Sequence, residues 1–238
     1  MIQFPDSFPN DASNPERYRV ALADDDEPPE GAQRDNPEGQ RRSQVERSRE
    51  ARDRLLAAAI DVLIRKGYNG LTTKEVAGCA QMSNGALMHH FSSKEELVVA
   101  ATSAVYQAAI ARGQQVANTE AAARRPIEGF ITDCLSIYFD WPFIAALEVI
   151  VVARTDMALM TRILPVMEAY RDTVNGIWLK VFERAGMTAA QANSVLNLTL
   201  NLVRGMAVNS LWRKDERLYK AQLEEWVELM ELKLANGR

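Results

Sequence analysis

The chain has 238 residues and is 47% apolar, which is enough for a sizeable core in one large or two modest domains. Its net charge of −4 arises in residues 1–40, where three arginines face ten acidic residues; residues 41–99 carry ten basic against seven acidic residues, and residues 100–238 are balanced. No apolar run approaches the roughly 18 residues of a membrane span, no secretory signal is visible and only two cysteines are present, which argues against a membrane protein and against a disulfide-rich secreted one.

Residues 1–45 are predicted to be an acidic tail. The stretch "DDDEPPEGAQRDNPEGQ" is rich in Pro, Asp, Glu, Asn and Gly and shows no apolar periodicity. Such a composition cannot bury enough apolar surface to offset the entropy lost on folding. We therefore expect a disordered tail on a cytoplasmic protein whose fold begins near residue 46.

Three helices are predicted in the next part of the chain. Thr72, with Glu75 three residues later, forms a capping box that opens a short helix near 73–80. After a tight turn, Ser83 can cap another short helix that ends at about His90. The helix before them ends at Gly67 and has one apolar face at helical spacing, made of Leu55, Leu56, Ala59, Ile60, Leu63 and Ile64.

The rest of the chain also has helical periodicity, with neither strand-like alternation nor internal repeats. Pro165 is expected to kink its helix, and Gly186 to end it. We predict an all-α fold of about nine helices. The fourth helix begins at Ser92 or Ser93 and runs to about residue 117. The fifth begins at Pro126, and the sixth follows the break "WPF" (141–143). The last three span 157–185, 188–213 and 216–236.

Residues 55–91 are predicted to form a helix, a capped short helix, a tight turn and another short helix. The two short helices and their turn make a helix-turn-helix, in which the second short helix lies in the DNA major groove. The stretch "GYNGLTTKEVAGCAQMSNGALMHHFSSKEEL" (67–97) resembles the DNA-binding domain of TetR/AcrR-type transcriptional repressors. The resemblance implies a DNA-binding domain over 46–108, with its motif at about 72–91, and an effector-binding and dimerisation domain over 109–238. The matching residues are Gly67, Tyr68, Thr72, Thr73, Val76, Ala77, Ala80, Ser83, Gly85, Leu87, His90, Phe91, Lys94, Glu95 and Leu97.

The resemblance also implies which residues meet DNA. Asn84 can pair bidentately with adenine, and Ala86 suits a thymine methyl group. Lys94 is expected at a phosphate, whereas Leu87 and Phe91 face inward. The implied contact residues are Thr72, Thr73, Ser83, Asn84, Gly85, Ala86, His89 and Lys94. Ser83 could instead be only a cap.

Two residues depart from the family pattern. Gln81 stands where the turn usually has Gly, so we expect a turn that does not use the left-handed φ that Gly allows. Met88 replaces the usual Tyr, which removes a phenol that touches a phosphate in the family. One positioning contact is therefore expected to be missing.

Other features of this region have two readings. The run "RRSQVERSREARDR" (41–54) has six arginines against three acidic residues, which fits either phosphate binding or a solvated helix face. Cys79 could be a redox sensor, but we expect a small buried helix residue. His89 and His90 point about 100° apart on a helix, so they cannot share one metal ion. With no catalytic motif, we expect neither an enzyme nor a cofactor or metal.

Residues 193–212 are apolar on nearly every side, and the last helix has one apolar stripe. Both features fit either an intramolecular core or a partner. Because they resemble the four-helix dimer interface of the family, we expect a homodimer. The candidate interface residues are Leu202, Met206, Leu223, Trp226 and Met230.

The middle helices carry methionine and aromatic residues, which line adaptable apolar pockets but also fill ordinary cores. The candidate ligand-binding residues are Phe130, Cys134, Tyr138, Trp141, Met160, Met167 and Trp178. The sequence shows no buried charge cluster that would name a ligand. We expect the effector to be small and apolar.

Together these features predict a cytoplasmic DNA-binding transcriptional regulator that needs no membrane. It would be a homodimeric repressor on a near-palindromic double-stranded operator, released by the effector. The alternative is an α-helical small-molecule-binding or enzymatic protein in which the helix-turn-helix is only structural.

Overall fold

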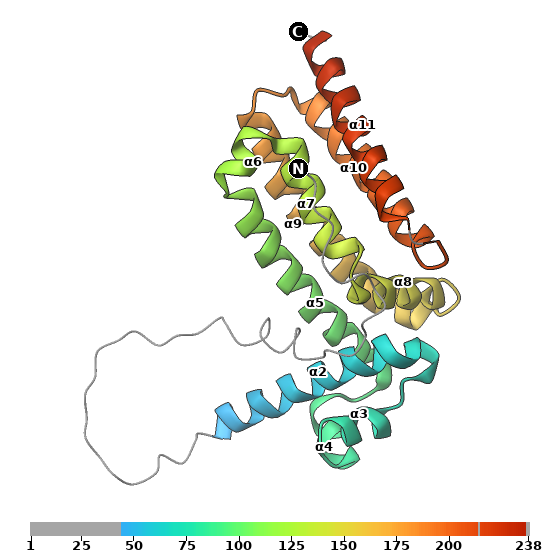
Figure 1. The fold of residues 1–238 in the computed structure, drawn as a ribbon. Coiled ribbons are helices and arrows are strands. Elements are labelled where there is room, and N and C mark those ends of the chain that lie inside the picture. Colours follow the sequence, from blue (N-terminus) through green and yellow to red (C-terminus); the bar gives the residue numbers. More distant parts are fainter. Residues whose placement is uncertain (1–43, 214, 237–238) are drawn as a thin grey trace, which may run out of the picture. The chain divides into compact units, whose positions relative to one another are not determined.

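A computed structural model describes residues 44–213 and 215–236, apart from the side chains of residues 141 and 142. These residues form ten helices and no strand, which confirms the all-α prediction (Figure 1). The helices are α2 (Gln44–Gly70), α3 (Thr73–Cys79), α4 (Asn84–His90), α5 (Lys94–Ala117), α6 (Glu120–Arg124), α7 (Pro126–Tyr138), α8 (Trp141–Ala153), α9 (Met157–Arg184), α10 (Ala189–Asn209) and α11 (Glu216–Asn236).

The predicted tail lies outside the described residues, except that α2 already includes its last two positions. The chain divides into two compact units within α5, between Val105 and Tyr106. We call them the N-terminal and the C-terminal unit.

In the N-terminal unit, α2 packs against α3, and α3 packs against α4. Gly67 interrupts α2 with a φ of 68°, a conformation that glycine tolerates best, so the predicted end of the first helix is confirmed by this break. The core of the unit is apolar. Its fully buried side chains include Leu55, Val62, Val76, Leu87, Phe91 and Leu97.

Hydroxyl side chains begin both short helices, as predicted. The Thr72 Oγ1 accepts a hydrogen bond from the Glu75 backbone N–H at 3.2 Å. The Ser83 Oγ accepts one from the Ala86 N–H at 3.1 Å. A seven-residue helix leaves most of its terminal N–H groups without an intrahelical partner, so each of these caps stabilises the helix it starts.

The turn between α3 and α4 differs from the sequence-based expectation. Gln81 has a φ of 55°, so the turn uses the left-handed conformation although the residue is not glycine. The Gln81 N–H donates to the Gly78 carbonyl at 3.0 Å, and the Met82 N–H donates to the Ala77 carbonyl at 2.9 Å. This pair of bonds is a Schellman motif, which requires a left-handed residue at this position. The expectation of a turn without that φ was therefore wrong.

The C-terminal unit is built around α7, which packs against α6, α8, α9, α10 and α11. At its centre the Phe130 ring lies 5.2 Å from the Trp178 ring and 5.6 Å from the Phe182 ring. Helix α9 contains Pro165, and Gly186, with a φ of 90°, follows its cap. The predicted end at Gly186 is confirmed.

Helix α6 was not predicted from the sequence. It has only five residues, which are too few to show an apolar period. The Thr119 side chain caps it by accepting a hydrogen bond from the Ala122 N–H at 3.1 Å, and the Ala122 side chain is buried against the core.

One carboxylate, that of Asp133, is buried in this core with an exposed fraction of 1%. Its Oδ2 accepts a hydrogen bond from the Trp178 indole at 2.7 Å, and its Oδ1 has no hydrogen-bond partner among the described residues. A Cβ on Gly113 would lie 3.0 Å from Oδ2, so the carboxylate fits because this residue is a glycine. Burial raises the Asp133 pKa to about 6, partly opposed by the Trp178 hydrogen bond and the charge of Arg112.

No single helix within the described ranges is both long and apolar enough to cross a membrane. The bent pair of segments 126–138 and 143–153 passes that test on length and composition alone.

The Gln81→Gly variant should be more stable than the parent. Glycine removes the side-chain cost of the left-handed conformation, about 1–2 kcal/mol, but adds some entropy to the unfolded chain. We expect a net gain of roughly 0.5–1 kcal/mol in the free energy of unfolding, measured by chemical denaturation. Gln81→Ala is the matched control, since it keeps the Cβ and should show no such gain. An equal gain in both variants would contradict strain at Gln81.

The Asp133→Asn variant should change how stability depends on pH. The pKa of Asp133 is raised in the folded state, so the proton stabilises the fold at low pH, and this contribution is lost as pH rises from 3.8 to about 6. A shift of this size corresponds to about 3 kcal/mol. The stability of Asp133→Asn relative to the parent should therefore increase from pH 4 to pH 7, as followed by denaturation. Asp172→Asn, at an exposed position of α9, is the control for the substitution itself.

Candidate nucleic-acid interface and buried core site

Helix α4 presents a polar face and buries an apolar one. Asn84, Gly85 and His89 are exposed, whereas Leu87 and the following Phe91 are fully buried. This is the orientation predicted for a recognition helix. Ala86 is half-buried, so only part of its methyl group faces outward.

Gly85 has no role in packing that explains its lack of a side chain. A Cβ built at this position would meet only the Ser83 Oγ, at an ordinary distance of 3.8 Å. Gly85 is the second residue of α4 and is exposed, so it leaves the start of this exposed face without a side chain.

The predicted threonine and serine contacts have defined structural roles. Thr72 and Ser83 are exposed caps of α3 and α4, and Thr73, the first residue of α3, is half-buried. As a cap, Ser83 uses its hydroxyl oxygen as an acceptor, and its proton remains able to reach a phosphate.

Lys94 lies at the first residue of α5 and is half-buried. Its Nζ lies 4.2 Å from the centre of the Tyr68 ring, a cation–π contact. Burial lowers the pKa of the Lys94 ammonium from its usual value. The ring therefore holds the charge at the start of α5.

Two arginines of the basic run stabilise the motif itself. The Arg54 Nη2 donates to the Ala80 carbonyl at 2.6 Å, at the end of α3. The Arg52 guanidinium lies 4.4 Å from the centre of the Phe91 ring, beyond the end of α4. The exposed Arg47 and Arg49 lie earlier on α2. Arg52 and Arg54 therefore contact the helix-turn-helix itself, a role that neither of the two readings of the run had included.

Cys79 was expected to be buried, and the structure contradicts this. It is exposed at the last residue of α3, where the Arg65 Nη2 lies 3.5 Å from its Sγ. Both cysteines are free thiols, and Cys134 is the buried one. The α3 residues that face the core are Val76 and Ala77, so the position of Cys79 on this short helix turns it outward.

In the C-terminal unit, the structure brings four of the predicted ligand-binding residues together in one core: Phe130, Cys134, Tyr138 and Trp178. Met160 and Met167 are half-buried on α9. The Trp141 side chain lies outside the described residues.

A polar cluster that was not predicted from the sequence lies in this core. It consists of Tyr106 (α5), Tyr138 (α7), Tyr170 (α9) and Arg204 (α10), next to Asp133. The Arg204 Nη2 donates to the Tyr138 hydroxyl at 2.7 Å, and the Tyr106 and Tyr170 rings stack with their centres 4.3 Å apart. We call these four residues the tyrosine–arginine cluster.

The sequence did contain a signal for this cluster. Asp133 stands among buried apolar residues of α7, and Arg204 interrupts the apolar stretch 193–212. Charged residues are almost never fully buried unless they are paired. Asp133 is the one charged residue that the described part of the structure buries fully, and Arg204 is half-buried, so each is an isolated charge in an apolar region.

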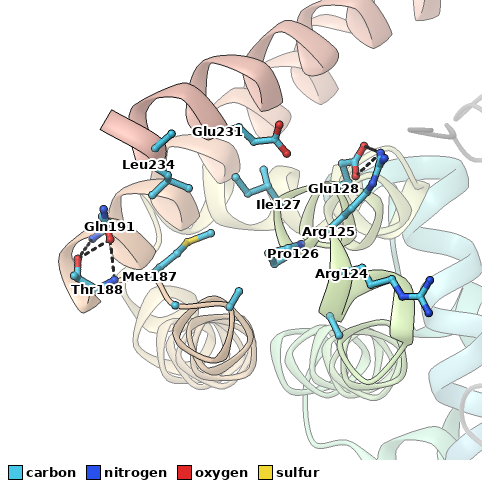
Figure 2. Close-up of a pocket in the computed structure, with 14 residues that line it drawn as sticks. Arg124, Arg125, Pro126, Ile127, Glu128, Met187, Thr188, Gln191, Glu231 and Leu234 are labelled. Atoms are coloured by element: carbon cyan, nitrogen blue, oxygen red, sulfur yellow. Dashed lines mark hydrogen bonds and ion pairs between the residues drawn. The ribbon is translucent and has the colours of Figure 1, made fainter. Parts of the chain in front are cut away.

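Two hollows of the C-terminal unit lie away from the predicted ligand-binding residues. One, of about 660 Å³, lies between the start of α7, the α9–α10 loop and the end of α11. In Figure 2, Ile127, Met187 and Leu234 line it, and the Arg125–Glu128 ion pair lies on one side. The second, of about 650 Å³, is an open groove between α10 and α11.

The candidate interface residues divide into two groups. Met206, Leu223 and Met230 are buried in the core of the single chain, and of these three Met206 also borders the groove between α10 and α11. Leu202 and Trp226 are half-buried and line the groove between α10 and α11. Helical periodicity marked an apolar stripe correctly but could not separate its inner edge from its outer edge.

Known proteins resemble this chain in both sequence and fold. Residues 55–101 match the family described as "Bacterial regulatory proteins, tetR family". The HTH-type transcriptional regulator CymR of Pseudomonas putida is 36% identical over 184 residues, which cover 76% of this chain and 89% of that protein. QacR of Staphylococcus aureus is 39% identical over 46 residues, 19% of this chain and 24% of QacR.

Solved structures show the same fold. The TetR family regulator PfmR of Thermus thermophilus superimposes with a TM-score of 0.51 at 19% identity, over 74% of this chain and 96% of PfmR. FadR of Bacillus subtilis, solved in complex with stearoyl-CoA, gives 0.53 at 15% identity, over 74% and 96%. With its helix-turn-helix and the long match to CymR, the chain belongs to the TetR family of DNA-binding transcriptional regulators.

Proposed function

We propose that this regulator is a homodimeric repressor that binds a near-palindromic operator and leaves it when a small effector binds the C-terminal unit. The observation that carries the proposal is the polar face of α4, on which Asn84, Gly85 and His89 are exposed while the opposite, apolar face is buried. Its place of action would be the cytoplasm.

In this proposal α4 enters the major groove. Asn84 would pair with adenine and the Ala86 methyl group would touch thymine, while Gly85 would allow the backbone to approach closely. Lys94, the caps Thr72 and Ser83, and Thr73 would hold phosphates and so fix the register of the helix. Seven residues reach few bases, so a specific site needs two copies of α4.

The second copy would pack on the outer faces of α10 and α11. Leu198 and Leu202 lie one turn apart on α10, and Leu218 and Leu229 lie three turns apart on α11, so each pair shares a helix face; all four are exposed or half-buried. Gly205 lies in the same groove and has no atom within 4 Å of an added Cβ, so a partner helix could approach there. Such a face fits a four-helix interface between two subunits.

Effector binding would act by shifting the dimer between two states. FadR of Bacillus subtilis has been solved with stearoyl-CoA, which supports small-molecule binding in a protein of this fold. An effector can shift the equilibrium only by its difference in affinity for the two states, and coupling of about 1–3 kcal/mol is common.

Asn84→Ala should weaken operator binding by roughly 1–3 kcal/mol and relax base preference at one position of the site. Binding of the parent should fall steeply with salt because phosphate contacts dominate. Gel-shift titrations against DNA flanking the gene, at several salt concentrations, would measure both effects. Asn118→Ala, on a residue just after α5, is the matched control. Equal affinity of the parent for this DNA and for random duplex would refute the proposal.

Leu229→Glu should produce monomers. Leu229 is 51% exposed in the single chain, so the charge should spare the subunit fold and disrupt only the packing of two subunits. Sedimentation would show the change in mass, and operator binding should fall with it. Leu164→Glu, on an apolar α9 residue that is 43% exposed, is the control and should remain dimeric. If Leu229→Glu sediments like the parent, the groove is not the interface.

A further inference from the structure

The tyrosine–arginine cluster has more hydrogen-bond donors than acceptors. The Tyr138 hydroxyl accepts from Arg204, so its own proton needs a different acceptor. The Tyr170 hydroxyl is buried and close enough to Tyr138 to influence its pKa, but it makes no hydrogen bond of good geometry with any described residue. Burial raises the pKa of Tyr106 and of Tyr138 to about 12, so these phenols remain protonated at neutral pH.

Arg204 adds a positive charge to this excess of donors. It is half-buried, and its Cζ lies 4.9 Å from the centre of the Tyr138 ring. A guanidinium has five N–H donors, and one of them is used by Tyr138. None of the ion pairs between described residues includes Arg204. A half-buried cation without a carboxylate is costly to retain in a core.

The nearby carboxylate does not serve as that partner. Asp133 directs its Oδ2 to the Trp178 indole, and the charge of Arg112 lowers its pKa. The other contacts of the cluster are aromatic: Tyr106 stacks on Tyr170, and the Tyr138 and Phe143 rings meet edge to face with centres 4.8 Å apart. The cluster therefore combines the donors and the positive charge of Arg204 with neighbouring aromatic rings.

We propose that the tyrosine–arginine cluster binds the carboxylate of a small organic acid with an apolar body, and that such an acid is the effector. A carboxylate accepts up to four hydrogen bonds and can engage a guanidinium through two of them. It would supply an acceptor for the Tyr170 hydroxyl and for N–H groups of Arg204 that Tyr138 does not use. The inference rests on the proposed function for the role of the effector, and it replaces the expectation of a purely apolar molecule.

Matched acids and amides test the charge directly. Benzoate, 3-phenylpropionate and octanoate are each compared with the corresponding carboxamide, which has nearly the same shape but no charge. Calorimetry and thermal shift of the full chain at pH 7.5 give the affinities. We expect at least one acid to bind about tenfold or more tightly than its amide, as loss of a charge-assisted bidentate pair would predict.

Variants of the cluster assign that preference to residues. Arg204→Gln should reduce the acid-to-amide ratio to nearly one, and Arg204→Lys should restore part of it. Tyr170→Phe removes a buried hydroxyl that makes no hydrogen bond of good geometry, so the free protein should be at least as stable while its affinity for the acid falls. Tyr219→Phe is the control: its hydroxyl donates to the Arg213 carbonyl at 2.9 Å, so this change should lower stability and leave the preference unchanged.

Two outcomes overturn the inference: no acid in the panel binds more tightly than its amide, or Arg204→Gln keeps the preference. Operator binding by the free protein is measured separately by gel shift. If the operator binds but no acid is preferred, the proposed function survives without this inference. If acids are preferred and no DNA binds specifically, the site stands and the proposed function fails.

Discussion

The need to satisfy backbone polar groups at the ends of two seven-residue helices governs the DNA-binding half of this protein. Such helices leave most of their terminal N–H and C=O groups without an intrahelical partner. Thr72 and Ser83 supply acceptors at the two starts, the left-handed Gln81 closes the end of α3, and Arg54 reaches from α2 to the carbonyl just beyond it. The exposed face of α4 is therefore oriented by hydrogen bonds as well as by its apolar contacts.

In the C-terminal unit, two buried side-chain polar atoms of the described residues have no hydrogen-bond partner. Its core is apolar, and its buried carboxylate has one strong partner in the Trp178 indole. The Asp133 Oδ1 and the Tyr170 hydroxyl have no partner among the described residues. Unpaired buried polar atoms each cost about 1–3 kcal/mol, so a core that contains two of them has given up stability. They lie where four helices bring polar side chains together, and the proposed carboxylate would supply an acceptor for the Tyr170 hydroxyl but not a donor for the Asp133 Oδ1.

The arginines of the basic run (41–54) do not all have the same role: some contact the helix-turn-helix, and others are exposed. The net charge of the chain is negative, which is unusual for a DNA-binding protein until the acidic residues 1–40 are set apart. Arg52 and Arg54 hold the ends of α3 and α4, while Arg47 and Arg49 lie exposed on α2. An arginine that satisfies a carbonyl has fewer donors left for phosphate, so counting charges overstates the interface.

The sequence by itself determined the helices, their caps and the helix-turn-helix, because these depend on local spacing: Thr72 and Ser83 act within three residues of their own positions. It could not determine contacts between residues distant along the chain. That Arg204 meets Tyr138, or that Leu223 faces its own core while Leu229 faces outward, follows from how the helices pack. An apolar stripe shows that a helix face is covered, but only tertiary structure decides whether the same chain covers it or leaves it for a partner.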